Sequence, residues 1–139
     1  MRNKASLTLL ELAVMLLVFA LAAVLCLRAF VWADAASKES AARDRAWIQA
    51  QNAAEVLKGC GGDMEEAAGM FGGAWDGAEW AVCYNEDWDQ TDAEHTYTLR
   101  AVSGDSGVEH LGQAAVSVCQ DDLELAALEV CWQEVSGDG

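Results

Sequence analysis

The stretch LTLLELAVMLLVFALAAVLCL, residues 7–27, decides how this chain is built. Its 21 residues are apolar except for Thr8 and Glu11, and a helix of about 20 apolar residues spans the hydrocarbon core of a membrane. The stretch therefore predicts a transmembrane helix. Arg2 and Lys4 precede it, and positive charges stay on the cytoplasmic side. We expect a cytoplasmic N-terminus, a single pass through the cell membrane and an extracytoplasmic remainder.

Glu11 is the feature of this stretch that needs an explanation. An acidic residue at the centre of a membrane helix costs about 3 kcal/mol, and less near its edge. A plain signal anchor or a cleaved secretory signal gives Glu11 no role. Thr8 and Glu11 have the spacing of a capping box, which would satisfy backbone donors at a helix start. That interpretation does not explain why the helix would start inside an apolar run.

The residues from Ser6 to Leu12, SLTLLEL, follow a short basic leader and open a long apolar helix. This pattern resembles the cleavage and methylation motif of type IV prepilins and of the pseudopilins of type II secretion. The resemblance implies that residues 1–6 are a leader, which prepilin peptidase removes between Ser6 and Leu7, and that Leu7 is then N-methylated. Glu11 would pair with the Leu7 amine of a neighbouring subunit and fix the axial register of a filament, because buried charges are tolerated when they are paired.

The resemblance favours a minor subunit over a bulk filament protein. The family most often has Gly before the cut and Phe after it, and here Ser6 and Leu7 keep the size and polarity class. Residues 20–28 lack the Gly or Pro that usually breaks this helix in major pilins. The filament would be a type IV pilus, a competence pilus or a type II secretion pseudopilus. The implied partners are other pilin or pseudopilin subunits, prepilin peptidase, the membrane and assembly-platform proteins.

The helical pattern continues beyond the apolar stretch. Residues 28–58 are rich in Ala, Arg, Gln and Glu, which favour helix, and the glycine-rich residues 59–62 end the pattern. We expect one helix over about 8–58, whose residues 28–58 form its soluble half. An apolar stripe on that half would pack on the head and consists of Trp47, Ala50, Ala54 and Leu57, with Val56 alongside.

Residues 59–139 predict an acidic globular head. A short helix is expected over 63–71, the segment 72–80 is expected to be loop, and SGDSG at 103–107 is expected to be a turn. Alternating apolar residues predict four half-buried strands, at Trp80–Tyr84, Thr96–Val102, Ala114–Cys119 and Leu128–Val135. The expected fold class is α+β and pilin-like, a long N-terminal helix packed against a C-terminal antiparallel sheet of about four strands. Three tryptophans are core candidates, Trp47, Trp80 and Trp132, whereas Trp75 and Trp88 fall in expected loops.

The charge of the chain is strongly uneven. From residue 59 onward there are one base, Arg100, and eighteen acids, a formal charge of −17. A surface this acidic repels phosphate backbones, so we expect no direct nucleic-acid binding. The excess of acids suits solubility, cation binding or a basic partner.

Four of the five cysteines, Cys60, Cys83, Cys119 and Cys131, lie after the membrane stretch, where disulfides can persist. Four cysteines allow three pairings. Cys119 and Cys131 flank an expected hairpin, which favours that pair and leaves Cys60 with Cys83. Free thiols are the alternative. The absence of CxxC spacing argues against zinc.

Residues 85–94, NEDWDQTDAE, concentrate oxygen ligands of the kind calcium prefers. The spacing and glycine of an EF-hand are missing, so a solvated acidic loop is favoured and no cofactor is expected. His95 and His110 each follow a glutamate without a nucleophile motif nearby. The sequence therefore predicts a structural protein and not an enzyme. The alternative is a membrane-tethered extracellular binding or adhesion domain, held by an uncleaved signal anchor.

Overall fold

A computed structural model describes residues 2–134 as a long helix and an antiparallel sheet, an α+β arrangement. Helix α1 runs from Arg2 to Gly59 without interruption, so the helix expected over 8–58 is confirmed and begins earlier. Thr8 lies inside it and donates its hydroxyl hydrogen to the carbonyl oxygen of Lys4 at 2.8 Å. Because Thr8 is not at a helix start, the capping-box interpretation of Glu11 is wrong.

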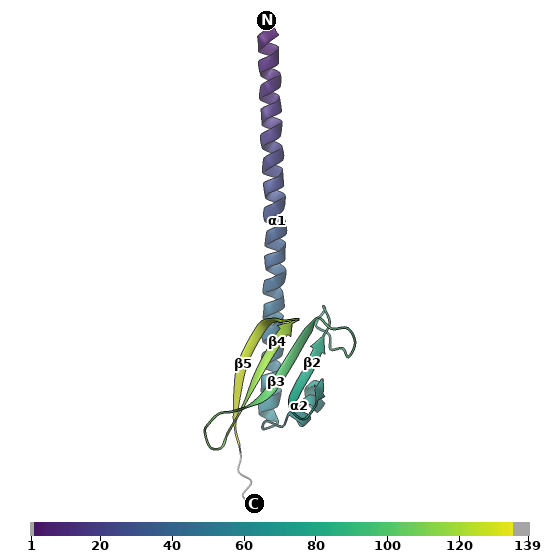
Figure 1. The fold of residues 1–139 in the computed structure, drawn as a ribbon, viewed down its shortest axis with the longest axis vertical. Helices are drawn as coiled ribbons and strands as arrows, with labels where there is room; N and C mark the ends of the chain where they lie inside the picture. The colour runs from purple at the N-terminus through teal and green to yellow at the C-terminus, as the bar shows by residue number, and fades with distance from the viewer. Residues whose placement is uncertain (1, 135–139) are drawn as a thin grey trace, which may run out of the picture. The chain divides into compact units, whose positions relative to one another are not determined.

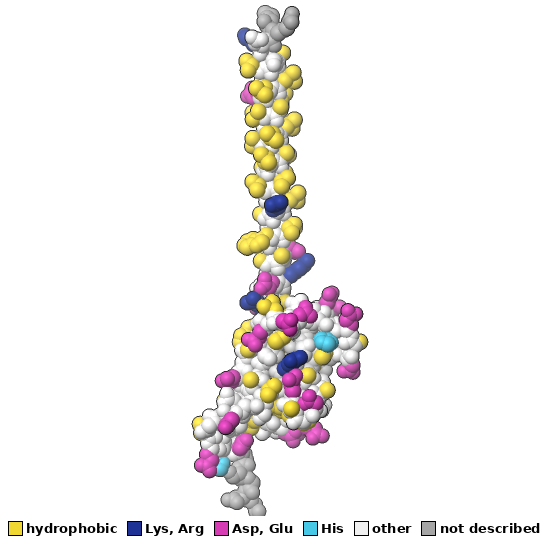
Figure 2. All heavy atoms as spheres, in the orientation of Figure 1, with side chains coloured by type: hydrophobic (Ala, Val, Ile, Leu, Met, Phe, Trp, Pro, Cys, Tyr) yellow, Lys and Arg dark blue, Asp and Glu magenta, His cyan; other side chains and the backbone are white. Residues whose placement is uncertain are grey.

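The chain divides after Ser40 into two compact units, which are described separately. In the first unit every described residue is helical, and the large apolar side chains from Leu7 to Trp32 are exposed. Figure 2 shows these side chains around the N-terminal part of α1. Helix α1 is long and apolar enough to cross a membrane, which is consistent with a single-pass membrane protein.

The second unit contains residues 41–59 of α1, helix α2 (Met64–Phe71) and one sheet. The five strands follow each other in chain order and each pairs antiparallel with the next (Figure 1). Their bounds are Ala74–Trp75 (β1), Glu79–Tyr84 (β2), Tyr97–Asp105 (β3), Leu111–Gln120 (β4) and Leu123–Gln133 (β5).

The sheet has five strands and not the expected four, because β1 forms in a segment expected to be loop. Trp75 pairs with Trp80 across a tight connection. The carboxylate of Asp76 accepts hydrogen bonds from the backbone N–H groups of Ala78 and Glu79, both at 2.8 Å. Such an Asx turn stabilises a local reversal, and two residues of pairing are too few to give an alternating pattern in sequence.

The expected strands are present but longer. Residues 103–105, expected to be turn, extend β3 and pair with β4, so the reversal falls later, before Leu111. Strand β5 begins at Leu123 rather than Leu128. Val135, the expected end of the last strand, lies outside the described residues. The short helix expected over 63–71 is confirmed as α2, whose first turn is capped by the Asp63 carboxylate.

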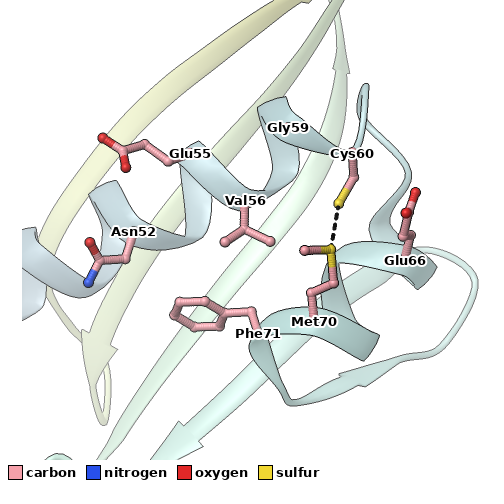
Figure 3. Close-up of a pocket in the computed structure, with 8 residues that line it drawn as sticks. All are labelled: Asn52, Glu55, Val56, Gly59, Cys60, Glu66, Met70 and Phe71. Carbon is pink, nitrogen blue, oxygen red and sulfur yellow. Dashed lines mark hydrogen bonds between the residues drawn. The ribbon is translucent and has the colours of Figure 1, made fainter.

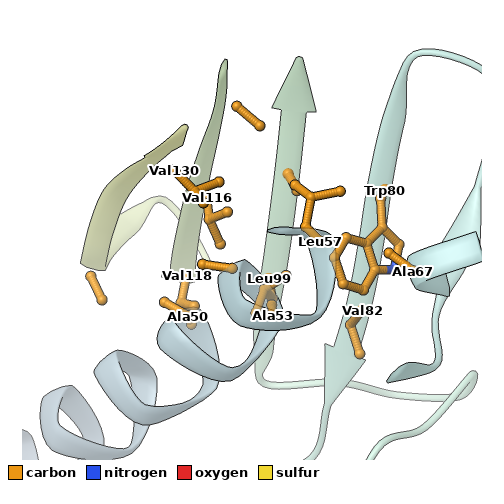
Figure 4. Close-up of a cluster of buried hydrophobic side chains, with 14 of the residues drawn as sticks. Ala50, Ala53, Leu57, Ala67, Trp80, Val82, Leu99, Val116, Val118 and Val130 are labelled. Atoms are coloured by element: carbon orange, nitrogen blue, oxygen red, sulfur yellow. The ribbon is translucent and has the colours of Figure 1, made fainter. Parts of the chain in front are cut away.

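An alanine-rich face of α1 packs against the sheet. Its buried residues recur at helical spacing, at Ala46, Ala50, Ala53 and Leu57, with Ala54 alongside. The small side chains of this face are buried against the sheet, and Leu57 lies in the same cluster as Trp80 on β2 and Val116 on β4 (Figure 4).

Two of the three tryptophans expected in the core are buried, namely Trp80 and Trp132. The expectation for Trp47 is wrong, because its side chain is 43% exposed. The buried face begins one residue earlier, at Ala46, and one residue turns the helix by about 100°. An indole has no room where alanines set the distance between helix and sheet. Trp88, expected in a loop, is half-buried and stacks on Tyr97 with ring centroids 4.0 Å apart.

Tyr84 ties the sheet to α1, since its hydroxyl donates to Oε1 of Gln49 at 3.4 Å. Burial raises the pKa of Tyr84 to about 12, whereas an unfolded tyrosine titrates near pH 10. Only the unfolded chain therefore loses this proton between about pH 10 and 12, and the free energy of unfolding falls over that pH range.

Urea unfolding of the full chain in detergent micelles should show this fall in the free energy of unfolding between about pH 10 and 12, and the Tyr84→Phe variant should lack it. An equal decline in both proteins would contradict the prediction.

The indole of Trp132 lies against two glycines. A Cβ atom added to Gly62 or Gly112 would overlap the indole ring, and Gly112 faces Trp132 across the β4–β5 ladder. Gly62 also has a positive φ of 90°, which glycine adopts without strain. Glycine at these two positions is thus what allows Trp132 to be buried.

Gly112→Ala should displace Trp132 and lower the free energy of unfolding by about 1–3 kcal/mol, because overpacking forces side chains from their preferred positions. Gly104→Ala is the matched control, since a Cβ at this strand glycine would meet only ordinary contacts with Gln113 at 3.8 Å. Urea unfolding followed by tryptophan fluorescence measures both. Equal losses of stability in the two variants would contradict this account of Gly112.

Candidate assembly surfaces

The residues from which the sequence predicts a cleavage and methylation site lie together on the first turns of α1. Ser6, Leu7 and Glu11 are all exposed there. Leu7 and Glu11 are four residues apart, so their side chains share one face of the helix. The neighbouring apolar side chains are exposed as well. A peptidase or a second helix can therefore reach this face within the unit of residues 2–40.

Glu11 has no ion-pair partner within the part of the chain that the structure describes. The side chains around it are apolar, and an unpaired carboxylate in such surroundings is costly in a membrane. A cation from another molecule would remove that cost. The chemistry of this face thus matches an ionic contact with a second chain.

The apolar surface of α1 extends beyond the expected span of residues 7–27. Arg28 follows the span, and then Phe30, Val31 and Trp32 are again exposed. Tryptophan is enriched where a membrane meets water, and arginine reaches toward head groups. Asp34 and Lys38 form an exposed ion pair at 3.0 Å in the next turns. The change from apolar to charged surface therefore falls at about Trp32.

A groove lies between the end of α1 and α2 in the second unit (Figure 3). Its volume is about 680 Å³, and its lining residues are Asn52, Glu55, Val56, Gly59, Cys60, Glu66, Met70 and Phe71. Apolar side chains form most of the surface, with Glu55 and Glu66 at the margins. No local pattern in the sequence predicts this groove. It arises because residues 60–62 fold α2 back beside the last turns of α1.

Cys60 and Met70 meet across one side of the groove. The thiol of Cys60 donates to Sδ of Met70 at 3.7 Å. Burial raises the pKa of the Cys60 thiol, and the charges of Glu66 and Asp63 raise it further. Cys60 is therefore held as a neutral thiol, which is a poor nucleophile. Its environment fits a packing role and not a reactive one.

Neither predicted disulfide is formed, since all five cysteines are free. Cys119 on β4 faces Glu124, and Cys131 is seven residues further along β5. Seven strand residues span about 23 Å, whereas a disulfide needs Cα atoms within about 7 Å. Cys83 alternates with the buried Val82 and Tyr84, so it lies on the face of the sheet away from α1 and cannot meet Cys60.

The acidic loop of residues 85–94 is organised by Asn85, whose side-chain oxygen accepts from the backbone N–H groups of Asp87 and Asp89 at 2.9 and 3.0 Å. Within residues 2–134, no three His, Cys, Asp or Glu side chains converge in a way that could hold a metal ion. The carboxylates project from different parts of the loop into solvent. The loop provides negative surface, as Figure 2 shows across the second unit.

Comparison with known proteins adds no relative, because neither a protein family, nor a curated protein, nor a solved structure matches the chain.

The thiols provide a direct test of the strand register. Iodoacetamide added to the denatured, never-reduced chain should modify all five cysteines, giving the same mass as a sample reduced first. In the native protein Cys131, which is exposed, should react faster than Cys60, because the raised pKa of Cys60 leaves little thiolate. A mass that rises only after reduction would reveal a disulfide and contradict the register.

Proposed function

We propose that this chain is a structural minor subunit of a type IV pilus-like filament, a competence pilus or a type II secretion pseudopilus. The observation that carries the proposal is Glu11, an unpaired carboxylate on an exposed apolar helix, four residues after Leu7. The Ser6–Leu12 motif places a peptidase cut such that Leu7 supplies a free amine at the same end of the helix. An amine and a carboxylate from neighbouring chains would satisfy each other.

The proposed life cycle follows from these residues. The chain inserts in the cell membrane with its N-terminus in the cytoplasm and the acidic unit outside, as Arg2 and Lys4 favour. Prepilin peptidase removes residues 1–6 and methylates Leu7. Assembly-platform proteins then move the subunit into a filament, where other pilin or pseudopilin subunits cover its apolar helix. The α+β arrangement of helix and antiparallel sheet supports this proposal at the level of architecture.

The decisive experiment is analysis of the intact mass and the N-terminal peptide after expression with and without a prepilin peptidase. With the peptidase, the chain should begin at Leu7 and be about 14 Da heavier than the unmodified form, the mass of one methyl group. Without it, the chain should retain residues 1–6. An unprocessed chain in both samples would favour the rival, a membrane-tethered binding or adhesion domain. A cut beyond Leu27 would contradict both.

Glu11→Leu separates membrane insertion from assembly. The variant should insert as well as the parent chain, because it only removes a charge from an apolar helix. It should fail to enter sheared filaments, since the Leu7 amine loses its partner. Thr8→Val is the matched control, as the Thr8 hydroxyl bonds only within its own helix. Normal assembly of Glu11→Leu, measured as the sheared fraction, would remove the proposed role of the carboxylate.

A further inference from the structure

The groove between α1 and α2 has the character of a docking site for a small apolar segment that carries positive charge. Val56 and Phe71 provide an apolar surface, and Met70 beside them is 71% exposed (Figure 3). Methionine adapts its shape to an incoming side chain. Glu55 and Glu66 at the margins place negative charge on either side. A neutral or acidic ligand would leave these carboxylates without compensation.

One other surface of the second unit has the complementary character. Trp47 and Ile48 are 43% and 51% exposed on α1, and Arg43 and Arg45 precede them, with Asp44 between. We call Arg45, Trp47 and Ile48 the Trp47 patch. Elsewhere in residues 41–134, the bases are Lys58 and Arg100, and Arg100 contacts Glu79 at 3.3 Å. The Trp47 patch is the place on residues 41–59 of α1 where large exposed apolar side chains adjoin bases.

We propose that the groove receives the Trp47 patch of a second copy of this chain, in a head-to-tail contact between neighbouring subunits. The inference rests on the proposed function, since it supplies a contact between the heads of a filament. Trp47 or Ile48 of one copy lies over Val56 and Phe71 of the next, and Arg45 lies near Glu55. Charge complementarity selects this occupant, because copies that met through their acidic surfaces would repel each other.

The positions of the two surfaces on α1 set the geometry of the contact. Ile48 and Val56 are eight residues apart, which corresponds to about 12 Å along a helix. A shift by about that distance, combined with a rotation about the helix axis and without reversal of the helix, brings the Trp47 patch of one copy to face the groove of another. Two different surfaces of one chain form a heterologous contact, which repeats without closing. Chains inserted in one membrane in one direction can make this contact.

The test uses the full-length chain in membranes, with a photo-crosslinking amino acid in place of Met70. Copies with natural and heavy isotopes are mixed before illumination, so that contacts between copies are distinguished from those within one. The expected product joins position 70 of one copy to Trp47 or Ile48 of another, within the tryptic peptide of residues 46–58. The same crosslinker at Val108, an exposed residue at the β3–β4 connection, is the control and should give no such product.

Exchanging the charges of Arg45 and Glu55 tests the ionic part of the contact, and the yield of the inter-copy crosslink is again the measured quantity. Arg45→Glu and Glu55→Arg should each lower the yield of the inter-copy product about tenfold, because like charges then face each other. The double variant carries the exchanged pair in every copy and should restore the yield. A product with another segment, a product with a different protein, or no inter-copy product would overturn the proposal. Failure of the double variant to restore the yield would remove Arg45 and Glu55 from the contact.

The N-terminal peptide is recorded on the same samples, which keeps this inference separate from the proposed function. A Leu7 N-terminus without the inter-copy product would leave the filament proposal standing and overturn the head-to-tail contact. An intact Met1 with that product would support the contact and contradict processing as a prepilin.

Discussion

The packing of α1 against the sheet is the contact on which the rest of the second unit depends. Alanines at helical spacing, rather than large side chains, form most of the buried face of the helix. Leu57 and the sheet residues Trp80 and Val116 then supply the volume that fills the remaining space. A small unit has a small hydrophobic core, so this one packing surface positions the strands. It also sets which face of α1 is buried, and Trp47 remains exposed as a result.

The same packing explains where the groove and the exposed indole come from. With the alanine face turned to the sheet, the remaining sides of α1 carry Trp47 and Ile48 toward solvent and Val56 toward α2. The reversal at residues 60–62 then brings α2 alongside. Both surfaces of the proposed contact are therefore consequences of one choice of buried face, and a change in that choice would remove them together.

Charge divides the chain into an acidic region after residue 59 and a more basic helix before it, and this division is compatible with the proposed assembly. The acids after residue 59 keep the sheet soluble and oppose contact between sheets of different copies. The bases are concentrated on the helix before that point. Attraction between copies is thereby limited to contacts that involve α1. At the other end of the helix, Glu11 is a single acid in an apolar surface, and in the proposed assembly it would pair with an amine of a neighbouring chain.

The long helix, its apolar N-terminal stretch, the short helix after Asp63 and four of the strands were predictable from sequence patterns alone. Local sequence patterns predict these features, because hydrophobic periodicity, helix-capping residues and helix-ending glycines each involve only a few neighbouring residues. The cleavage motif and the role of Glu11 were also inferred from one continuous segment, and they stay predictions. Burial of Trp80 and Trp132 followed from their places in alternating strands.

Features that depend on residues far apart in the chain emerged from packing and pairing in the folded protein. Which face of α1 is buried was decided by the fit of alanines against the sheet, and propensity could not distinguish that face from the one with Trp47. The register of β4 against β5 decided that Cys119 and Cys131 are too far apart to pair. Strand β1 exists through its pairing with β2. The groove exists because two helices separated by a turn lie side by side, and distances across such a turn are set by packing and not by any local pattern.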